Sequence, residues 1–318
     1  MTLTELRYIV ALARERHFGR AAQACHASQP TVSVAIRKLE QELGVRLFER
    51  GAGDVTLTSH GVRIVDQAQR ILDGAAEIRQ IARLGADPLN GPLRLAAIYT
   101  IGPYLLPALV RQLLRDVPQM PLLLNEDFTV RLLEMLKNGQ IDAAVLALPL
   151  PDAGLVLQPL YDEPFVVAVP RTHPWARRKS IGVHELSSQT NLLLGSGHCF
   201  RDQVLDACPE LDRPGAIDGA QKPVEGSSLE TIRQMVASGI GVAVLPITSM
   251  PAQAQRDALI AYLPFRRPAP SRRVVLAWRK SFTRTPAMHA LCSAVQRCAL
   301  PGAVVLTPSA RDYEAAIV

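Results

Sequence analysis

The fold of the N-terminal part is decided by residues 28–44, which read SQPTVSVAIRKLEQELG. Ser28 is a residue type that caps helix N-termini, and Pro30 is tolerated in a first helical turn. Gly44 is the usual residue just past a helix end. A helix is therefore predicted over residues 29–43, with a polar leading end.

The residues upstream of this helix predict two more. Thr4 can cap a first helix whose apolar positions, Leu6 and Ile9 among them, recur at helical spacing. Residues 18–20 (FGR) are expected to break it, and residues 21–25 to form a short second helix. Two helices joined by a tight turn make a helix-turn-helix. Downstream, residues 47–50 and 55–58 predict a hairpin, so residues 1–58 are expected to be a winged helix-turn-helix domain.

The leading end of the predicted third helix carries hydrogen-bonding side chains. Gln29, Thr31, Ser33 and Arg37 are types that contact base edges and phosphates in the major groove. The alternative is a three-helix module that binds only protein. The polar helix start favours DNA.

Three segments of this domain resemble the LysR-type transcriptional regulators: residues 18–22 (FGRAA), 28–33 (SQPTVS) and 39–50 (LEQELGVRLFER). The resemblance covers the domain nearly end to end and implies binding to double-stranded DNA. The residues that it implies for DNA contact are Ser28, Gln29, Pro30, Thr31, Ser33, Arg37, Lys38 and Arg50.

A long amphipathic stretch follows. Its apolar residues are spaced four and three apart, as in a coiled-coil seam: Ile64, Ala68, Ile71, Ala75, Ile78 and Ala82. A helix packed on its own domain is the alternative, but the run is long for that. Residues 59–90 are expected to be a dimerisation helix and hinge, ended by the linker at 87–92. A two-fold protein predicts a pseudo-palindromic operator.

Residues 91–300 alternate apolar runs with helical stretches, the pattern of βαβ units in a mostly parallel sheet. The pattern begins a second time near residue 166. We expect a two-lobed α/β domain, with lobe I at about 91–163 and 268–300 and lobe II at about 164–267. Its order resembles the effector domain of LysR-type regulators and the periplasmic solute-binding fold. Residues 301–318 are expected to be a C-terminal tail. The fold class is therefore multi-domain: an all-α winged helix-turn-helix, a long helix and this α/β domain.

Two cysteines bracket a predicted helix in lobe II. A short strand at residues 191–194 leads through a glycine-rich turn to residues 200–207, and Pro209 ends the helix. Cys199 should lie at its start and Cys208 near its end. Nine helical residues span on the order of 13 Å, whereas a disulfide needs Cα atoms roughly 4.4–6.8 Å apart. The helix must therefore unravel before the two can bond. On spacing alone, two unrelated buried thiols are the commoner case.

The surroundings of Cys199 favour a reactive thiol. A helix N-terminus, His198 and Arg201 would all favour the thiolate, the form that attacks peroxides. Thr100 and Thr129 follow strands of lobe I and should reach the same cleft, although each could simply be a helix cap.

The segment at residues 197–203 (GHCFRDQ), with Cys208 nine residues beyond Cys199, resembles the hydrogen-peroxide-sensing LysR-type regulators. By that resemblance Cys199 is the peroxide-reactive thiol and Cys208 its disulfide partner. Thr100, Thr129 and His198 would line the peroxide pocket, and Arg266 would stabilise the thiolate. Gly195 and Ser196 depart from the pattern, since an acidic residue often precedes the motif.

The resemblance further implies a homo-oligomer, a dimer of dimers, that controls oxidative-stress genes as activator and repressor. Hydrogen peroxide is the signal, a thiol reductant resets the protein, and RNA polymerase is a further partner. Two other functions are consistent with the residues: a LysR-type regulator that binds a small organic effector reversibly in the cleft, and a thiol peroxidase joined to a DNA-binding domain.

Composition sets bounds on these expectations. The 318 residues are 48% hydrophobic and 20% charged, which is ordinary for a globular protein of two or three domains. Five cysteines argue against a disulfide framework, and a net charge of +6 permits a nucleic-acid partner. No secretory signal or membrane span is predicted. We therefore expect a cytoplasmic regulator, not an enzyme, with no cofactor, no metal site and no membrane contact.

Overall fold

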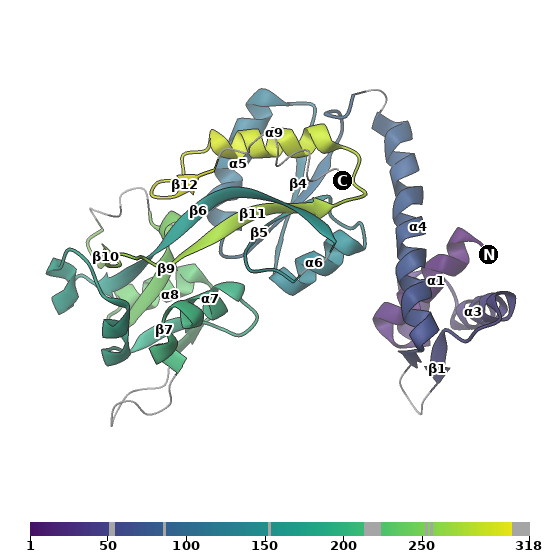
Figure 1. Cartoon of the computed structure of the whole chain (residues 1–318), viewed down its shortest axis with the longest axis horizontal. Helices are drawn as coiled ribbons and strands as arrows, with labels where there is room; N and C mark the ends of the chain where they lie inside the picture. The colour runs from purple at the N-terminus through teal and green to yellow at the C-terminus, as the bar shows by residue number, and fades with distance from the viewer. Residues whose placement is uncertain are drawn as a thin grey trace. The chain divides into compact units, whose positions relative to one another are not determined.

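The structure is a computed structural model that describes residues 1–50, 55–84, 87–151, 154–212, 224–251, 254 and 257–306. The chain divides into two compact units, Met1–Asp87 and Pro88–Val318. Each is described by itself (Figure 1).

The first unit contains the three predicted helices and the wing. Its elements are α1 Leu3–Glu15, α2 Phe18–Ala24, α3 Gln29–Leu43, β1 Phe48–Arg50, β2 Val55–Leu57 and α4 Ser59–Leu84. As predicted, Ser28 caps α3 and Gly44 ends it in the left-handed conformation, at φ +68°. The tip of the hairpin, residues 51–54, lies outside the described residues.

Two predicted boundaries in this unit are wrong. Thr2, not Thr4, caps α1, because its hydroxyl accepts from the Glu5 N–H while the Glu5 carboxylate accepts from Thr2. Residues 18–20 begin α2 instead of separating two helices, since the side chain of His17 caps them through the N–H groups of Gly19 and Arg20. A histidine cap is not among the usual signals for a helix start.

The wing is attached to α3 by Glu40. Its carboxylate accepts hydrogen bonds from the backbone N–H groups of Leu47 (2.8 Å) and Phe48 (3.2 Å). Helix α3 and the first wing strand are thus held in one rigid arrangement.

Helix α4 packs on the core of its own unit through apolar residues between positions 64 and 72. Ala68 is buried in the core of this unit, with Ile64 partly buried against it. Further along, Ile71 is 38% exposed and Ile78 is 69% exposed. Two of the seam residues, Ile71 and Ile78, are therefore exposed on the described part of this helix.

The second unit is built on one long mixed sheet with the strand order β4-β3-β5-β11-β6-β9-β7-β8, and β10 and β12 also pair with β6. Its strands are β3 Leu93–Ile98, β4 Leu122–Asp127, β5 Ala143–Ala147, β6 Leu155–Pro170, β7 Asn191–Leu194, β8 Val224–Gly226, β9 Val242–Pro246, β10 Ile260–Pro264, β11 Ser271–Arg279 and β12 Val304–Val305. Strands β3, β4 and β5 are parallel, as are β7, β8 and β9. Parallel pairing is thus present in both lobes, but the prediction of a mostly parallel sheet is wrong: β6 pairs antiparallel with β9, β10, β11 and β12, and β11 pairs antiparallel with β5.

Helices cover both faces of this sheet. They are α5 Gly102–Asp116, α6 Thr129–Lys137, α7 Cys199–Ala207, α8 Leu229–Ala237 and α9 Thr285–Gln296, with short 3₁₀ helices η1 Pro174–Arg177, η2 Val183–Ser188, η3 Pro209–Asp212 and η4 Ile247–Ser249. In lobe I, α5 and α9 lie together on one face and α6 on the other (Figure 1). Ser228 caps α8, because its hydroxyl accepts a hydrogen bond of 3.1 Å from the Thr231 N–H.

The two lobes share strand β6. Its first half pairs with β11, and its second half, from Phe165, pairs with β9 and β10. The chain thus passes from lobe I to lobe II within one continuous strand of 16 residues. Two separate clusters of buried apolar residues lie on either side of this crossing, one in each lobe.

Arg284 attaches the start of the second unit to its lobe I. The guanidinium donates to the backbone carbonyls of Pro88, Asn90, Gly91 and Pro92, at 2.9–3.2 Å. The Pro- and Gly-rich segment expected to be a linker is therefore held against α9 from residue 88 onward. Residues 301–306, expected to belong to a separate tail, supply β12.

Candidate functional site

Helix α7 has the limits that the sequence predicts. It runs from Cys199 to Ala207, and Cys208 is its C-cap. The turn before it contains Gly197 at φ +96°, a conformation that strains any side chain. The turn delivers Cys199 from the end of β7 to the junction of the two lobes.

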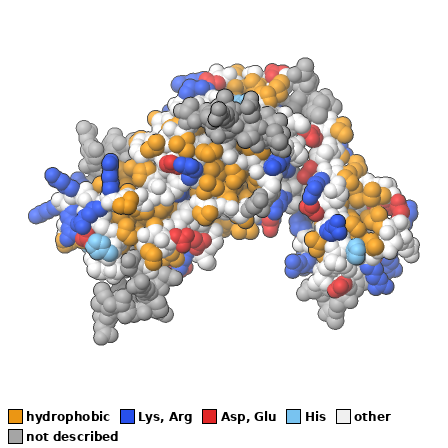
Figure 2. Space-filling view, viewed as in Figure 1, with side chains coloured by type: hydrophobic (Ala, Val, Ile, Leu, Met, Phe, Trp, Pro, Cys, Tyr) orange, Lys and Arg blue, Asp and Glu red, His pale blue; other side chains and the backbone are white. Residues whose placement is uncertain are grey.

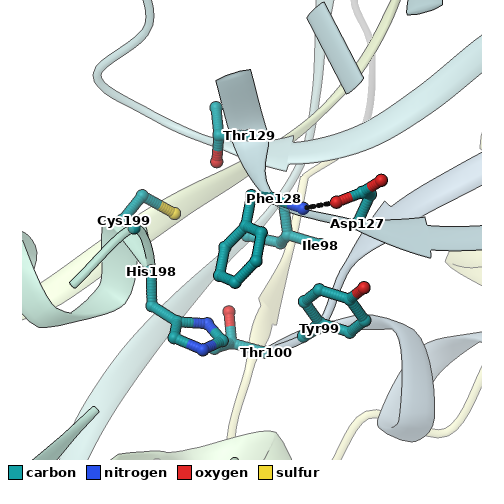
Figure 3. A pocket seen from close by; sticks show the side chains of 9 residues that line it. Ile98, Tyr99, Thr100, Asp127, Phe128, Thr129, His198 and Cys199 are labelled. Atoms are coloured by element: carbon teal, nitrogen blue, oxygen red, sulfur yellow. Dashed lines mark hydrogen bonds between the residues drawn. The ribbon is translucent and has the colours of Figure 1, made fainter. Parts of the chain in front are cut away.

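A small pocket lies at this junction. Its lining comes from the ends of two lobe I strands and from the α7 turn: Ile98, Tyr99, Thr100, Asp127, Phe128, Thr129, Gly197, His198 and Cys199 (Figure 3). The cavity measures about 10 Å³, which is room for about one water-sized molecule. Four of the predicted site residues, Thr100, Thr129, His198 and Cys199, are thus brought together although they come from three separate segments.

The polar atoms of the pocket differ in how they are satisfied. The Thr129 hydroxyl oxygen is buried and has no hydrogen-bond partner, and Figure 3 shows it on the same side as the Cys199 sulfur. A buried hydroxyl without a partner costs free energy unless a bound molecule satisfies it. This atom therefore marks a place where a small polar ligand would bind.

The Thr100 hydroxyl, by contrast, accepts a hydrogen bond of 2.9 Å from Nη1 of Arg272. Arg272 also donates to the Thr100 carbonyl at 3.0 Å and pairs through Nε with Glu163 Oε2 at 2.6 Å. Both side chains of the ion pair are fully buried. The guanidinium lies 4.9 Å from the ring centroid of Phe200, the second residue of α7.

Arg272 is the functional candidate that sequence reasoning missed, because one arginine among many in residues 266–297 carries no local signal of burial. Arg266, the arginine expected near the thiol, lies outside the pocket lining. Its side chain is 57% exposed and pairs with Glu185 at 3.0 Å. The buried cation next to the pocket is Arg272.

The positive charge expected from His198 and Arg201 is not at the thiol. Burial lowers the pKa of His198, an effect that a hydrogen bond to the Ser227 backbone only partly offsets, so its imidazole is neutral near pH 7. Arg201 donates to the Leu194 carbonyl and pairs with Glu225 at 2.7 Å. These contacts of Arg201 join α7 to the end of β7 and to β8.

The five cysteines differ in their surroundings, and all five are free thiols. Burial raises the pKa of Cys25 and Cys298, and raises that of Cys292 to about 12. Cys199 is half-buried at the pocket and packs against the lobe I core, whereas Cys208 is fully buried in the lobe II core. The two thiols at the ends of α7 therefore belong to different cores.

The residues expected to contact DNA lie on and beside α3. Gln29, Pro30, Thr31, Arg37 and Lys38 are exposed and Ser33 is half-buried, while the Ser28 hydroxyl bonds that of Thr31 at 2.8 Å. Figure 2 shows Lys and Arg side chains on the part of the first unit that carries α3. The side chain of Arg50 lies outside the described residues.

Comparison with known families assigns both units. The bacterial regulatory helix-turn-helix protein family, lysR type, matches residues 3–62, and the LysR substrate binding domain matches residues 86–299. This chain belongs to the LysR family. The predicted fold class, a helix-turn-helix domain followed by an α/β regulatory domain, is thereby confirmed.

Individual LysR-family proteins are similar along nearly the whole chain. The DNA-binding transcriptional dual regulator OxyR of Escherichia coli is 40% identical over 279 residues, which are 88% of this chain and 90% of that protein. The structure of full-length OxyR from Pseudomonas aeruginosa, a Cys-to-Asp variant, is 48% identical with a TM-score of 0.74 and covers 97% of this chain and 99% of that one. A hydrogen-peroxide-bound mutant of Corynebacterium glutamicum OxyR is 32% identical, with a TM-score of 0.61, and covers 99% and 94%.

Two features are absent from the described residues. They contain no group of three or more His, Cys, Asp or Glu side chains placed to hold a metal ion. Among the described helices, none combines the length and the hydropathy needed to cross a membrane.

Proposed function

We propose that this protein is a DNA-binding regulator that senses hydrogen peroxide through Cys199 and stores the signal as a Cys199–Cys208 disulfide. The observation that carries the proposal is the pocket itself: a half-buried thiol beside a buried, unsatisfied hydroxyl of Thr129, in a cavity for about one small molecule. The similarity to OxyR proteins supports the same signal.

The disulfide forms from the two thiols in two chemical steps. The Cys199 thiolate sulfur bonds one peroxide oxygen, the O–O bond breaks, and the hydroxide that leaves takes up a proton to become water. The Cys208 sulfur then attacks the sulfenic acid, and a second water leaves as the disulfide forms. The Thr129 hydroxyl is placed to donate a hydrogen bond to a peroxide oxygen. Arg272 orients the Thr100 hydroxyl, which lines the same pocket. A thiol reductant returns both cysteines to the thiol form by exchange.

The packing of the two thiols converts this bond into a change of structure. Because Cys199 packs with lobe I and Cys208 with lobe II, at opposite ends of α7, the disulfide forms only if the helix unwinds and one sulfur leaves its core. Rearrangement of α7 then alters how the lobes pack, and through the oligomer how the DNA-binding domains are spaced.

The remaining parts of the chain are assigned by the same proposal. Residues 1–58 bind a pseudo-palindromic operator through α3, residues 59–90 dimerise along the α4 seam, and residues 91–300 sense peroxide. The exposed Ile71 and Ile78 support a partner helix at the seam. The active form is a cytoplasmic dimer of dimers that contacts RNA polymerase to control oxidative-stress genes.

A reversible organic effector is the alternative, and the size of the pocket argues against it. Its cavity of about 10 Å³ is far below the roughly 300–1,000 Å³ typical of organic-ligand pockets. A thiol peroxidase is the other alternative. It would turn over repeatedly with excess peroxide and reductant, whereas a sensor is oxidised once per signal.

The test is disulfide mapping by mass spectrometry on the full-length protein before and after stoichiometric hydrogen peroxide. We expect one new link, Cys199–Cys208, with Cys25 and Cys292 still reduced. Cys199→Ser should abolish both the link and the change in operator footprint, and Cys25→Ser should retain both. A regulator gated by an organic effector needs no Cys199. A change in operator footprint that persists in Cys199→Ser would therefore refute the proposal.

A further inference from the structure

The pocket has an inner and an outer wall of different character. Thr100 (2% exposed) and His198 (8% exposed) form the inner wall. Tyr99 and Phe128 line the same cavity, yet each is 38% exposed. These two rings therefore stand between the pocket and solvent, and Figure 3 shows Phe128 between Cys199 and Tyr99.

The rings support one another. The centroid of Phe128 lies 4.8 Å from that of His198 and 5.3 Å from that of Tyr99, both in edge-to-face geometry. Tyr99 also contacts His198, at 6.1 Å. Edge-to-face contacts between aromatic rings are favourable, so these contacts hold the outer wall in place.

Phe128 is fixed at its backbone as well as at its ring. Its N–H donates to the Asp127 carboxylate at 2.8 Å, and its carbonyl accepts from the Leu132 N–H at 3.0 Å in the first turn of α6. Gly197 lies next to the same ring, since a Cβ atom built on it would be in van der Waals contact with Phe128, at 3.5 Å. The Phe128 ring therefore lies close to the α7 turn that carries Cys199.

We infer that Phe128, with Tyr99, restricts Cys199 to hydrogen peroxide and excludes organic hydroperoxides. Both classes react in the same way, with sulfur bonding the terminal oxygen while water or an alcohol leaves. An alkyl or aryl group on the second oxygen has no room in a cavity of about 10 Å³ unless Phe128 is displaced. The inference rests on the proposed function and adds its substrate selectivity.

The experiment compares oxidation rates of Cys199 with hydrogen peroxide and with cumene hydroperoxide, by quenched alkylation and mass spectrometry of the full-length protein. The variants are Phe128→Ala and Tyr99→Ala. The matched control is Val130→Ala, an apolar residue on α6 that is exposed and does not line the pocket. Circular dichroism and thermal unfolding establish that each variant is folded.

We expect the wild type and Val130→Ala to react with hydrogen peroxide much faster than with cumene hydroperoxide. Phe128→Ala should raise the cumene hydroperoxide rate by roughly tenfold or more, since steric pocket contacts discriminate on this scale, with a smaller change for hydrogen peroxide. Tyr99→Ala should act in the same direction.

Two results would overturn the inference while leaving peroxide sensing intact. One is a wild-type protein that reacts equally fast with both oxidants. The other is a folded Phe128→Ala variant whose cumene hydroperoxide rate equals that of Val130→Ala. If wild-type Cys199 failed to react with hydrogen peroxide at all, the proposed function itself would fall.

Discussion

The side-chain amide of Gln203 donates a hydrogen bond of 2.9 Å to the backbone carbonyl of Leu148. Gln203 lies in the middle of α7, and Leu148 follows β5 of lobe I, so this bond ties the cysteine-bearing helix to the opposite lobe. If the disulfide forms only after α7 unwinds, the bond must break first. Under the proposed mechanism it is therefore part of the barrier to disulfide formation.

We expect Gln203→Leu to form the disulfide faster than the wild type and to lose about 0.5–1.5 kcal/mol of unfolding free energy, the usual contribution of one hydrogen bond. Gln112→Leu is the control, because Gln112 bonds Asp116 one turn along α5, and this hydrogen bond lies within lobe I and does not join the lobes. Stopped-flow oxidation with thiol quenching measures the rate. If Gln203→Leu is destabilised but forms the disulfide at the wild-type rate, the Gln203–Leu148 hydrogen bond does not contribute to the barrier.

Two adjacent arginines of β11 should differ sharply in their effect on stability. Arg272 pairs with Glu163 in full burial, and Arg273 pairs with Asp162 at the surface. Removing one partner of a buried pair leaves the other charge uncompensated, so Arg272→Met should cost about 3–5 kcal/mol. Arg273→Met should cost about 1 kcal/mol or less. Urea unfolding measures both, and equal losses would contradict the burial of the Arg272 pair.

The seam of α4 should control assembly. Ile78 is exposed at a seam position, and a lysine there would place a charge in the apolar interface. We expect Ile78→Lys to raise the dissociation constant of the dimer by on the order of tenfold or more, measured by light scattering over a dilution series. Ala76→Lys, on the same helix but outside the seam, should leave the dimer intact. A dimer unaffected by Ile78→Lys would place the interface elsewhere.

His198 should make stability depend on pH. Its pKa is lowered from 6.5 by burial, so below that value the unfolded chain binds a proton that the folded chain does not. The contribution of neutral His198 to the free energy of unfolding is therefore present in full above about pH 6.5. It is lost as the pH falls toward the lowered folded-state pKa. His198→Gln should flatten this part of the curve of unfolding free energy against pH. Superimposable slopes for the two proteins would count against a neutral, buried His198.

DNA binding should depend on Arg37, which is exposed on α3. If Arg37 contacts phosphate, Arg37→Ala weakens operator binding and reduces the slope of log K against log salt by about one. Arg131→Ala removes an exposed arginine from the other unit and should change neither the operator affinity nor the salt slope. Fluorescence anisotropy over a salt titration measures both quantities, and an unchanged slope for Arg37→Ala would exclude a phosphate contact.

Much of the local structure was predictable from residues close together in the chain. Ser28 and Gly44 define α3, and the glycine-rich turn and Pro209 define α7 with a cysteine at each end. Caps, breakers and helical periodicity act over a few residues, so they are readable in sequence. His17 shows the limit of this reasoning, since a cap made by an unusual residue type gives no signal.

Which charged group reaches the pocket was decided only by the tertiary structure. Arg272 bonds Thr100, 172 residues away, and Glu163, 109 residues away, while Arg266 turns to the surface. Nothing local distinguishes these two arginines. Burial and ion pairing depend on which strands become neighbours in the sheet, and here the crossing of β6 between the lobes places Glu163 beside β11. The sequence by itself determined where Cys199 and Cys208 lie on their helix, because caps and breakers act locally, and the meeting of the two lobes decided what surrounds them.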